Sequence, residues 1–407
     1  MASAFRLCAS KLLARNSVAG LCKVRNYIRS VNVAKIQVAF ISGKAMRVGD
    51  KKRPAPYPYE TKEYNLWHGM FDSTLARMDE NSKVIFVEGP IASGKTVFAE
   101  ALAADLDMKY FPAVTMDMEY INQYGWDMRQ LDSKLPVACR SYDVKNFCED
   151  PHHLNCANYQ ILMYRHRYSQ YIDALAHLFS TGQGVVMERS CYSDYIFLEA
   201  MYNAGYISKL ARGTYEDLVG LTISDVLLPH LVIYLDVPVP TVKEKIQKRG
   251  IPYEVNSKVF TTEYLEFIEH KYKQDYLREM AKHAHILIYD WTEEGDPEVV
   301  VEDIERLNFD VNKNDSKFQA WQFWDDAEWG EARRKFSDYK LNLLNNFNLG
   351  HCDAPELILS GADSKILYEV WAPGERFIKG FNADMGDKGL LWKRYPTKRE
   401  CRVFNIH

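Results

Sequence analysis

The sequence predicts an α/β protein in which a parallel β-sheet is covered by helices on both faces. Short apolar runs, most of them rich in β-branched residues, alternate along the chain with longer stretches of helical periodicity. A glycine-containing loop joins the first of these runs directly to a helical pattern. Because strands that alternate with helices pair in parallel and are buried on both faces, this order favours a three-layer architecture.

Five segments are expected to form the strands, and five more the main helices. The strands are expected at 84–87, 109–111, 184–187, 231–235 and 286–289. The helices are expected at 63–78, 95–106, 159–179, 193–204 and 263–282. A further strand-like run, 365–371, lies near the C-terminus.

Changes in composition divide the 407 residues into four parts. We expect a mitochondrial transit peptide at 1–27, an N-terminal extension at 28–82, a P-loop domain at 83–306 and a C-terminal extension at 307–407. The C-terminal extension is rich in aromatic residues, which either cover an edge of the core or contact a partner protein. They are Trp321, Phe323, Trp324, Trp329, Phe336, Tyr339 and Phe347.

The N-terminal residues have the composition of a mitochondrial presequence. All charged side chains before Asp50 are basic, and Ser, Ala and Leu are frequent among the remaining residues. The segment Arg25-Asn26-Tyr27 resembles a processing site, with cleavage after Tyr27. The alternative interpretation is a basic tail that binds phosphates or lipid.

Charge and hydropathy disfavour a nucleic-acid-binding protein and a membrane-spanning protein. The whole chain has a formal net charge of −4, and loss of the five Lys and Arg residues before Tyr27 would bring it to about −9. An acidic body disfavours nucleic-acid binding, which requires clustered basic residues. No apolar run reaches the roughly 18 residues that a membrane span needs, so we expect a protein that is soluble or peripheral to a membrane.

A cluster of cysteines and histidines, Cys148, His152, His153 and Cys156, raises the question of a metal site. The cluster lacks the second pair that a structural zinc site requires at a standard spacing. Reduced structural thiols are the favoured interpretation, because the mitochondrial matrix is a reducing compartment.

The segment 89–96 reads Gly-Pro-Ile-Ala-Ser-Gly-Lys-Thr and matches the phosphate-binding P-loop pattern G-x-x-x-x-G-K-[ST]. In such a loop the backbone N–H groups and the helix dipole attract phosphate, the Lys95 ammonium binds the outer phosphates, and the Thr96 hydroxyl binds magnesium. An expected strand precedes the loop and an expected helix follows it, as the motif requires. The pattern does not distinguish nucleotide binding from turnover. A dinucleotide-binding G-x-G-x-x-G fingerprint does not follow the first strand, which disfavours a dehydrogenase.

The P-loop, together with Glu188-Arg189-Ser190 at the end of a later strand, resembles the deoxynucleoside kinase family over roughly 83–290. This resemblance implies a deoxynucleoside kinase-like fold with a five-stranded parallel sheet. It also implies that Gln160 contacts the base, that Glu188 lies beside the magnesium ion, and that Arg189 supports the catalytic base and the substrate phosphate. Without the P-loop, we would expect Gln160 to be an ordinary amide on a helix and Arg189 to form a structural ion pair. The expected nucleotide-binding residues are Gly89, Ser93, Gly94, Lys95, Thr96 and Gln160, with Thr96 and Glu188 as the magnesium ligands.

Several departures from the family pattern predict weak or absent kinase activity. The family places a Glu-Pro segment after the second strand, whereas this chain offers only Asp117 or Glu119 as a substitute base. Cys148 occupies the position of a sugar-contacting tyrosine, and a thiol is a poor hydrogen-bond donor. In the lid, Arg249 matches an expected arginine, but Gln247 and Ile251 replace two others. Because arginines stabilise the transferring phosphate, these losses lower the expected rate by orders of magnitude. The remaining catalytic candidates are Glu119, Glu188, Arg189 and Arg249.

Longer strings at 181–190, 197–203 and 229–234 resemble a narrower group, the kinase-like 42-kDa accessory subunits of mitochondrial complex I. This resemblance implies a non-core subunit, peripheral to the inner membrane on its matrix side, whose partners are other subunits of the complex. A flavin (FAD) has been ascribed to that group, but no residues of this sequence support flavin binding; a nucleotide with magnesium is the expected ligand. The alternative function is an active mitochondrial deoxynucleoside kinase.

Overall fold

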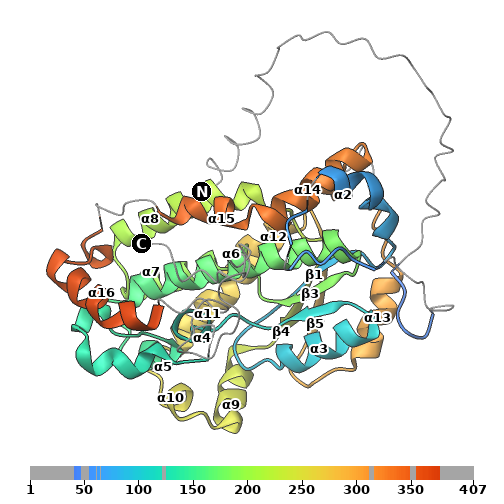
Figure 1. Ribbon diagram of the computed structural model, residues 1–407. Coiled ribbons are helices and arrows are strands. Elements are labelled where there is room, and N and C mark those ends of the chain that lie inside the picture. The colour runs from blue at the N-terminus through green and yellow to red at the C-terminus, as the bar shows by residue number, and fades with distance from the viewer. Residues whose placement is uncertain are drawn as a thin grey trace, which may run out of the picture. The chain divides into compact units, whose positions relative to one another are not determined.

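The computed structural model describes residues 41–46, 55–60, 62–64, 66–121, 125–310, 316–348 and 354–375 (Figure 1). The chain divides into two units, Met1–Gln37 and Val38–His407, and every described residue belongs to the second. The expected transit peptide, its cleavage site after Tyr27, and the C-terminal residues after 375 therefore lie outside the described residues.

The centre of the fold is a five-stranded parallel sheet (Figure 1). Its strands are β1 (Val84–Glu88), β2 (Lys109–Phe111), β3 (Val185–Glu188), β4 (Leu231–Asp236) and β5 (His285–Asp290), in the order β2-β3-β1-β4-β5. The five predicted strands and their parallel pairing are thus confirmed. In this order β2 and β3 lie on one side of β1, and β4 and β5 lie on the other. In parallel sheets of this kind, ligands bind in the crevice where the strand order reverses, which here lies outside the carboxyl end of β1.

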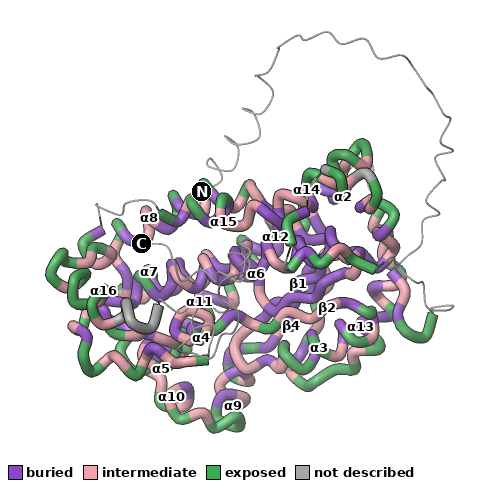
Figure 2. The backbone as a smooth tube through the Cα atoms, in the orientation of Figure 1, coloured by how far each residue is buried: buried purple, intermediate pink, exposed green. Residues whose placement is uncertain are grey.

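Alternating side chains of β1 face two separate hydrophobic clusters. Val84 and Phe86 belong to one cluster, in which Phe86 lies 5.2 Å from the Tyr171 ring, measured between centroids. Ile85 and Val87 belong to the other cluster. Every residue of β1 is buried, and Figure 2 shows the same burial along the central strands. Burial on both faces explains why this strand is a continuous apolar run instead of an alternating one.

Helices cover both faces of the sheet. The helices up to the third strand are α2 (Leu66–Phe71), α3 (Lys95–Asp105), α4 (Asp117–Tyr120), α5 (Val144–Glu149) and α6 (Cys156–Thr181). Those between the third and fifth strands are α7 (Tyr195–Asn203), α8 (Lys209–Thr222), α9 (Val239–Arg249), α10 (Pro252–Val255), α11 (Thr262–Lys271) and α12 (Leu277–Met280). The last are α13 (Pro297–Glu305), α14 (Asp326–Asp338), α15 (Lys340–Leu344) and α16 (Gly361–Glu375). The long helix α6 contributes to the first hydrophobic cluster, and α3 and α13 contribute to the second.

Three of the sequence predictions need correction. The strand expected at 365–371 is wrong, because this segment lies within helix α16. A helix satisfies its backbone hydrogen bonds locally, whereas a short strand would need a neighbouring sheet edge. The helix expected at 63–78 is only α2 followed by a 3-10 turn, Leu75–Arg77, and the helix expected at 263–282 is interrupted by a π-helical segment, Tyr272–Tyr276.

Most aromatic side chains of the C-terminal extension cover the core. Trp321 and Phe336 each stack on Phe179 of α6 with ring centroids 5.8 Å apart, and Phe347 is also buried in the first cluster. Trp324 differs from them, because 76% of its surface is exposed.

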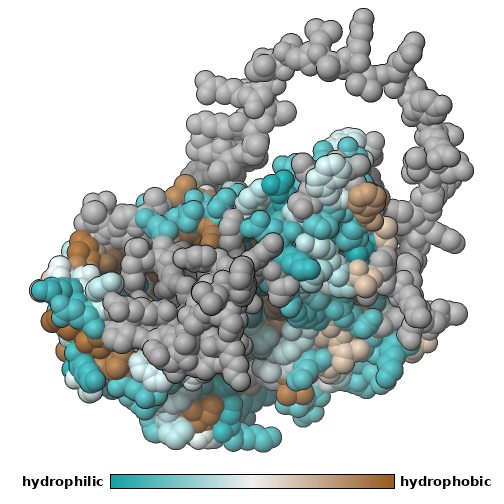
Figure 3. All heavy atoms as spheres, viewed as in Figure 1, coloured by the Kyte–Doolittle hydropathy of each residue, from teal (hydrophilic) through white to brown (hydrophobic). Residues whose placement is uncertain are grey.

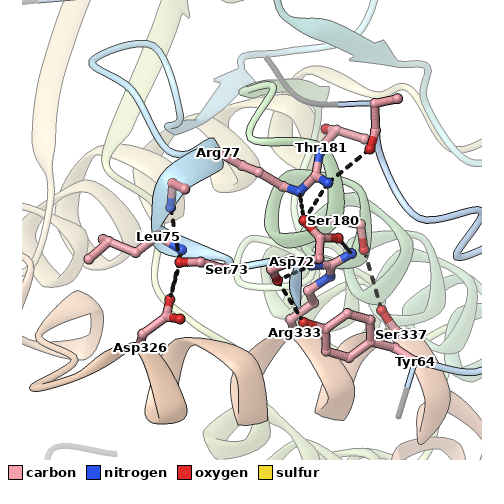
Figure 4. Close-up of polar contacts among 12 residues, drawn as sticks. Tyr64, Asp72, Ser73, Leu75, Arg77, Ser180, Thr181, Asp326, Arg333 and Ser337 are labelled. Carbon is pink, nitrogen blue, oxygen red and sulfur yellow. Dashed lines mark hydrogen bonds and ion pairs between the residues drawn. The ribbon is translucent and has the colours of Figure 1, made fainter. Parts of the chain in front are cut away.

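A buried polar cluster joins the N-terminal extension to the C-terminal extension (Figure 4). The guanidinium groups of Arg77 and Arg333 converge on the Asp72 carboxylate, with an Arg333–Asp72 distance of 3.1 Å. The Arg333 guanidinium also lies 3.9 Å from the centroid of the Tyr64 ring, and the Tyr64 backbone N–H donates to the Asp338 carboxylate. Arg333 is completely buried, so this cluster holds the two extensions together inside the protein.

A buried histidine next to the C-terminal extension, His230, is expected to lower the stability of the protein in acid. Burial lowers the pKa of His230 well below its usual value, and its Nδ1 accepts a hydrogen bond from the Val84 backbone N–H. Because the unfolded chain takes up a proton on His230 as the pH falls below about 6.5 and the folded chain does not, the free energy of unfolding should fall by about 1.4 kcal/mol per pH unit there.

The His230→Asn variant tests this pH dependence, since an amide oxygen can accept the same hydrogen bond without titrating. Urea unfolding at several pH values between 5 and 7 should show a shallower slope in the variant than in the original protein. Equal slopes in the two proteins would contradict the assignment to His230.

Candidate nucleotide-binding site

The loop 89–96 leaves the carboxyl end of β1 and leads into α3, as the motif requires. Gly89, Ala92 and Gly94 have φ angles of 150°, 56° and 83°. At Gly89 an added Cβ would lie 2.7 Å from the Leu235 carbonyl oxygen, so no larger residue fits between the loop and β4. These conformations turn the chain sharply and place the free N–H groups of the first turn of α3 beside the loop.

Lys95 is buried at the first position of α3, where its ammonium donates to the Pro90 carbonyl and to Ser93 Oγ, the latter at 3.1 Å. Burial lowers the pKa of Lys95 well below its usual value, and the nearby Arg189 charge lowers it further. An anion placed in the loop would oppose both effects, which gives a physical reason for phosphate to bind there.

The two expected magnesium ligands lie next to each other. Thr96 Oγ1 donates to Glu188 Oε2 at 2.8 Å, and the Tyr110 hydroxyl donates to the same carboxylate oxygen at 3.2 Å. Adjacent ligands of an octahedral Mg²⁺ site with bonds near 2.05 Å are separated by about 2.9 Å, so the Thr96–Glu188 pair fits one edge of such a site.

Glu88 is a buried carboxylate at the base of the loop that sequence reasoning missed. It accepts hydrogen bonds from Ser190 Oγ at 2.8 Å, from the Tyr272 hydroxyl at 3.0 Å and from the Tyr276 hydroxyl at 3.4 Å. The π-helical segment brings the two tyrosines to this point, and the Tyr272 hydroxyl also accepts from Arg189 Nη1 at 3.1 Å. Arg189 itself has a φ of 64°, so the turn after β3 is strained while its guanidinium stays beside the loop.

Gln160 belongs to a second polar group centred on Asp194, which is completely buried. The Asp194 carboxylate accepts from Gln160 Nε2 at 2.8 Å and from the Tyr215 hydroxyl at 2.6 Å, and it forms an ion pair with Arg167. Burial raises the pKa of Asp194, while the Arg167 charge opposes that effect. An amide, a carboxylate and a guanidinium together offer the donors and acceptors that could recognise a polar heterocycle. Arg167 and Asp194 were not predicted as site residues. The signal that could have revealed Arg167 is that it lies seven residues after Gln160 on the same helix.

The residues proposed as substitutes for the general base are held in other contacts. Glu119 Oε2 lies 2.8 Å from His166 Nε2, and His166 is buried on α6. Asp117 forms an ion pair with Arg129 at 2.8 Å. Neither of these two contacts involves the loop 89–96.

The polar side chains of the lid region differ in pairing and burial. The Arg249 guanidinium forms an ion pair with the buried Glu254, while Gln247 is exposed. Cys148 is completely buried, and burial raises the pKa of its thiol to about 11. A neutral, buried thiol packs as an apolar group.

Within the described part of the chain, no three His, Cys, Asp or Glu side chains gather to hold a metal ion, and Cys148 and Cys156 are instead free, buried thiols. No helix among those residues has the length and apolar character of a membrane span.

Comparison with known proteins identifies the class to which this fold and loop belong. The family model for deoxynucleoside kinases matches residues 85–322, which include the P-loop and all of the sheet except Val84, so the chain belongs to the deoxynucleoside kinase family. Deoxyguanosine kinase of Dictyostelium discoideum is 26% identical over 281 residues, covering 66% of this chain and 88% of that protein.

A higher identity joins the chain to a particular group. The mouse protein named NADH dehydrogenase [ubiquinone] 1 alpha subcomplex subunit 10, mitochondrial, is 39% identical over 326 residues, which cover 79% of this chain and 87% of the relative. The protein of the same name from Bos taurus is 37% identical over 79% of this chain and 90% of its own length. The chain is therefore also a member of the family of that subunit.

Proposed function

We propose that this protein is an accessory subunit of mitochondrial complex I, the NADH:ubiquinone oxidoreductase, and that it supports assembly or stability of the complex. The observation that carries the proposal is the 39% identity to a complex I subunit over 79% of this chain. The proposed location is the matrix side of the inner membrane, where the protein would be peripheral. The basic, acid-free N-terminal sequence supports import into mitochondria.

The P-loop supports a second part of the proposal, a bound nucleotide with magnesium. Lys95 and the N–H groups of α3 would hold the phosphates, while Thr96 and Glu188 would bind the ion. Gln160 and its Asp194 partner would face a base or sugar. A flavin has no place in this proposal.

The contacts of the candidate catalytic residues disfavour efficient kinase catalysis. Glu119 is engaged by His166, Arg249 by Glu254, and Cys148 is buried, so the general base and the lid arginines of a kinase have no evident replacement among these residues. The intact Thr96–Glu188 pair favours the alternative of an active deoxynucleoside kinase, which the experiment below also tests.

Native gel electrophoresis of mitochondria tests the first part of the proposal. We expect the protein to comigrate with NADH dehydrogenase activity, and we expect the purified chain to transfer little phosphate from ATP to deoxynucleosides. A protein that migrates freely and phosphorylates deoxynucleosides rapidly would instead be a kinase.

The Lys95→Ala variant is expected to weaken nucleotide binding by roughly 10- to 150-fold, because a hydrogen bond to a charged group contributes about 1.5–3 kcal/mol. Isothermal titration of the purified chain with nucleotide and magnesium measures the change. Lys282→Ala, at an exposed position paired with Glu279, is the matched control and should leave the affinity unchanged. Equal affinities for both variants would remove Lys95 from the site.

A further inference from the structure

Four large apolar side chains are exposed where the two extensions meet. They are Trp67 and Phe71 of α2, Leu75 of the following turn, and Trp324 just before α14, with 69%, 87%, 39% and 76% of their surfaces exposed. We call these four residues the aromatic patch. Figure 3 shows hydrophobic side chains among hydrophilic ones over this part of the surface, near the labels of α2 and α14 in Figure 1.

Hydrogen bonds bring the segments that carry Leu75 and Trp324 together although they are far apart in the sequence. The Leu75 backbone N–H donates to Asp326 Oδ1 at 3.1 Å, and Ser73 Oγ donates to the same oxygen at 2.8 Å (Figure 4). The Trp324 backbone N–H donates to Glu328 Oε2 at 2.8 Å, which holds Trp324 against the first turn of α14. Trp67 and Phe71 are four residues apart on α2 and therefore point from the same face of that helix.

Buried ion pairs connect the segments that carry the aromatic patch. Arg77, Arg333 and Asp72 form the buried cluster described above, and it fixes the turn that carries Leu75 to the helix that follows Trp324. Two exposed tryptophans and an exposed phenylalanine have the composition of an interface hot spot, where aromatic side chains enter a partner's pockets.

The charges in the two segments that carry the aromatic patch indicate the chemistry of the partner. Among the described residues of 55–79 and 322–331, the only exposed basic side chain is Lys62. The acidic side chains there, apart from Asp72, are Glu60, Glu63, Asp79, Asp325, Asp326, Glu328 and Glu331. An acidic rim repels an anionic lipid surface and repels a second copy of itself, and it attracts a basic protein surface.

We infer that the aromatic patch binds another polypeptide of the respiratory complex, through a surface that offers apolar pockets flanked by Lys or Arg side chains. This inference rests on the proposed function, because it assigns the surface by which the subunit attaches. It also explains why the two extensions are joined by a buried cluster: each supplies part of one docking surface.

Variants of the full-length chain, expressed in cells that lack the endogenous protein, test the inference. The triple variant Trp67→Ser, Phe71→Ser, Trp324→Ser removes the three aromatic side chains. The control Leu221→Ser, Val299→Ser, Tyr368→Ser removes three other exposed apolar side chains. The charge variant Glu63→Lys, Glu331→Lys reverses two rim charges and keeps the apolar residues.

On native gels we expect the complex-bound fraction of the triple variant to be at least about tenfold lower than that of the original protein. Hot-spot truncations commonly cost more than about 1.4 kcal/mol each, and about 1.4 kcal/mol corresponds to a tenfold change in affinity. The charge variant should show a smaller, salt-dependent loss, and the control should stay within about twofold of the original protein. Purified triple variant should retain its melting temperature and its nucleotide affinity, which separates loss of docking from loss of folding.

The outcomes distinguish the inference from the proposed function. An original chain that does not comigrate with complex I overturns the proposed function itself. An original chain and a triple variant that comigrate equally overturn only the docking surface. Three further results also overturn the docking surface. In the first, the original chain dimerises through the aromatic patch; in the second, it binds anionic vesicles through the patch. In the third, residues 376–407 of the same chain protect 66–75 from hydrogen exchange.

Discussion

Replacing Asp194 by alanine is expected to lower the free energy of unfolding by about 3–5 kcal/mol, because it leaves a buried guanidinium without its carboxylate. Asp194 is completely buried and pairs with Arg167, whose side chain is only 11% exposed. The same substitution removes the acceptor for Gln160 and Tyr215. Urea unfolding of the purified chain measures the change.

Two further variants make the Asp194 prediction specific. Asp217→Ala, at an exposed position of α8, should cost less than about 0.5 kcal/mol. The double variant Asp194→Leu, Arg167→Met should cost less than the sum of its single changes, since a buried ion pair can be replaced by apolar residues at little cost. A cost for Asp194→Ala no greater than that of Asp217→Ala would show that the buried pair contributes nothing to stability.

Replacing Arg333 by alanine should lower the free energy of unfolding by about 2–5 kcal/mol, chiefly because a completely buried large side chain is removed and leaves a cavity. The substitution leaves Asp72 with Arg77 as its remaining charged partner, and it empties the space that the Arg333 side chain fills beside the Tyr64 ring. Since the cluster joins the two extensions, limited proteolysis should also cut the 55–82 segment faster in this variant.

Matched variants separate charge from packing at Arg333. Arg333→Met keeps most of the apolar stem and should recover part of the lost stability. Arg306→Ala removes an arginine that is 71% exposed and should change the free energy of unfolding by less than about 1 kcal/mol. If Arg333→Ala and Arg306→Ala had equal effects, the cluster would not hold the extensions.

Much of the sheet and of the phosphate loop could be predicted because their signals are local. The run Val84–Glu88 is continuously apolar up to its last residue, and the loop after it carries a motif whose glycines are required by the backbone itself. The fate of Glu119 could not be predicted, because His166 is brought to it only by the packing of α6. The Glu88 network was equally hidden, since Tyr272 and Tyr276 reach it through a π-helical turn.

Secondary structure was misjudged where local pattern and tertiary context disagree. The segment 365–371 has the β-branched and aromatic residues of a strand, but it finds no sheet edge and forms part of α16. The segment 63–78 has helical periodicity, but its helix ends at Phe71. The next two residues, Asp72 and Ser73, instead contact Arg333 and Asp326.

The sequence by itself determined the parallel α/β order, the phosphate-binding loop and the relation to kinase-like subunits, because each depends on residues adjacent in the chain. Only the tertiary structure decided which charges are paired and which apolar side chains remain exposed. Arg333 and Trp324 lie nine residues apart at the start of the same C-terminal extension, yet one is fully buried against Asp72 and the other is 76% exposed. The physical reason is that burial and ion pairing depend on segments distant in the chain, here the turn after α2, whose position relative to α14 no local pattern encodes.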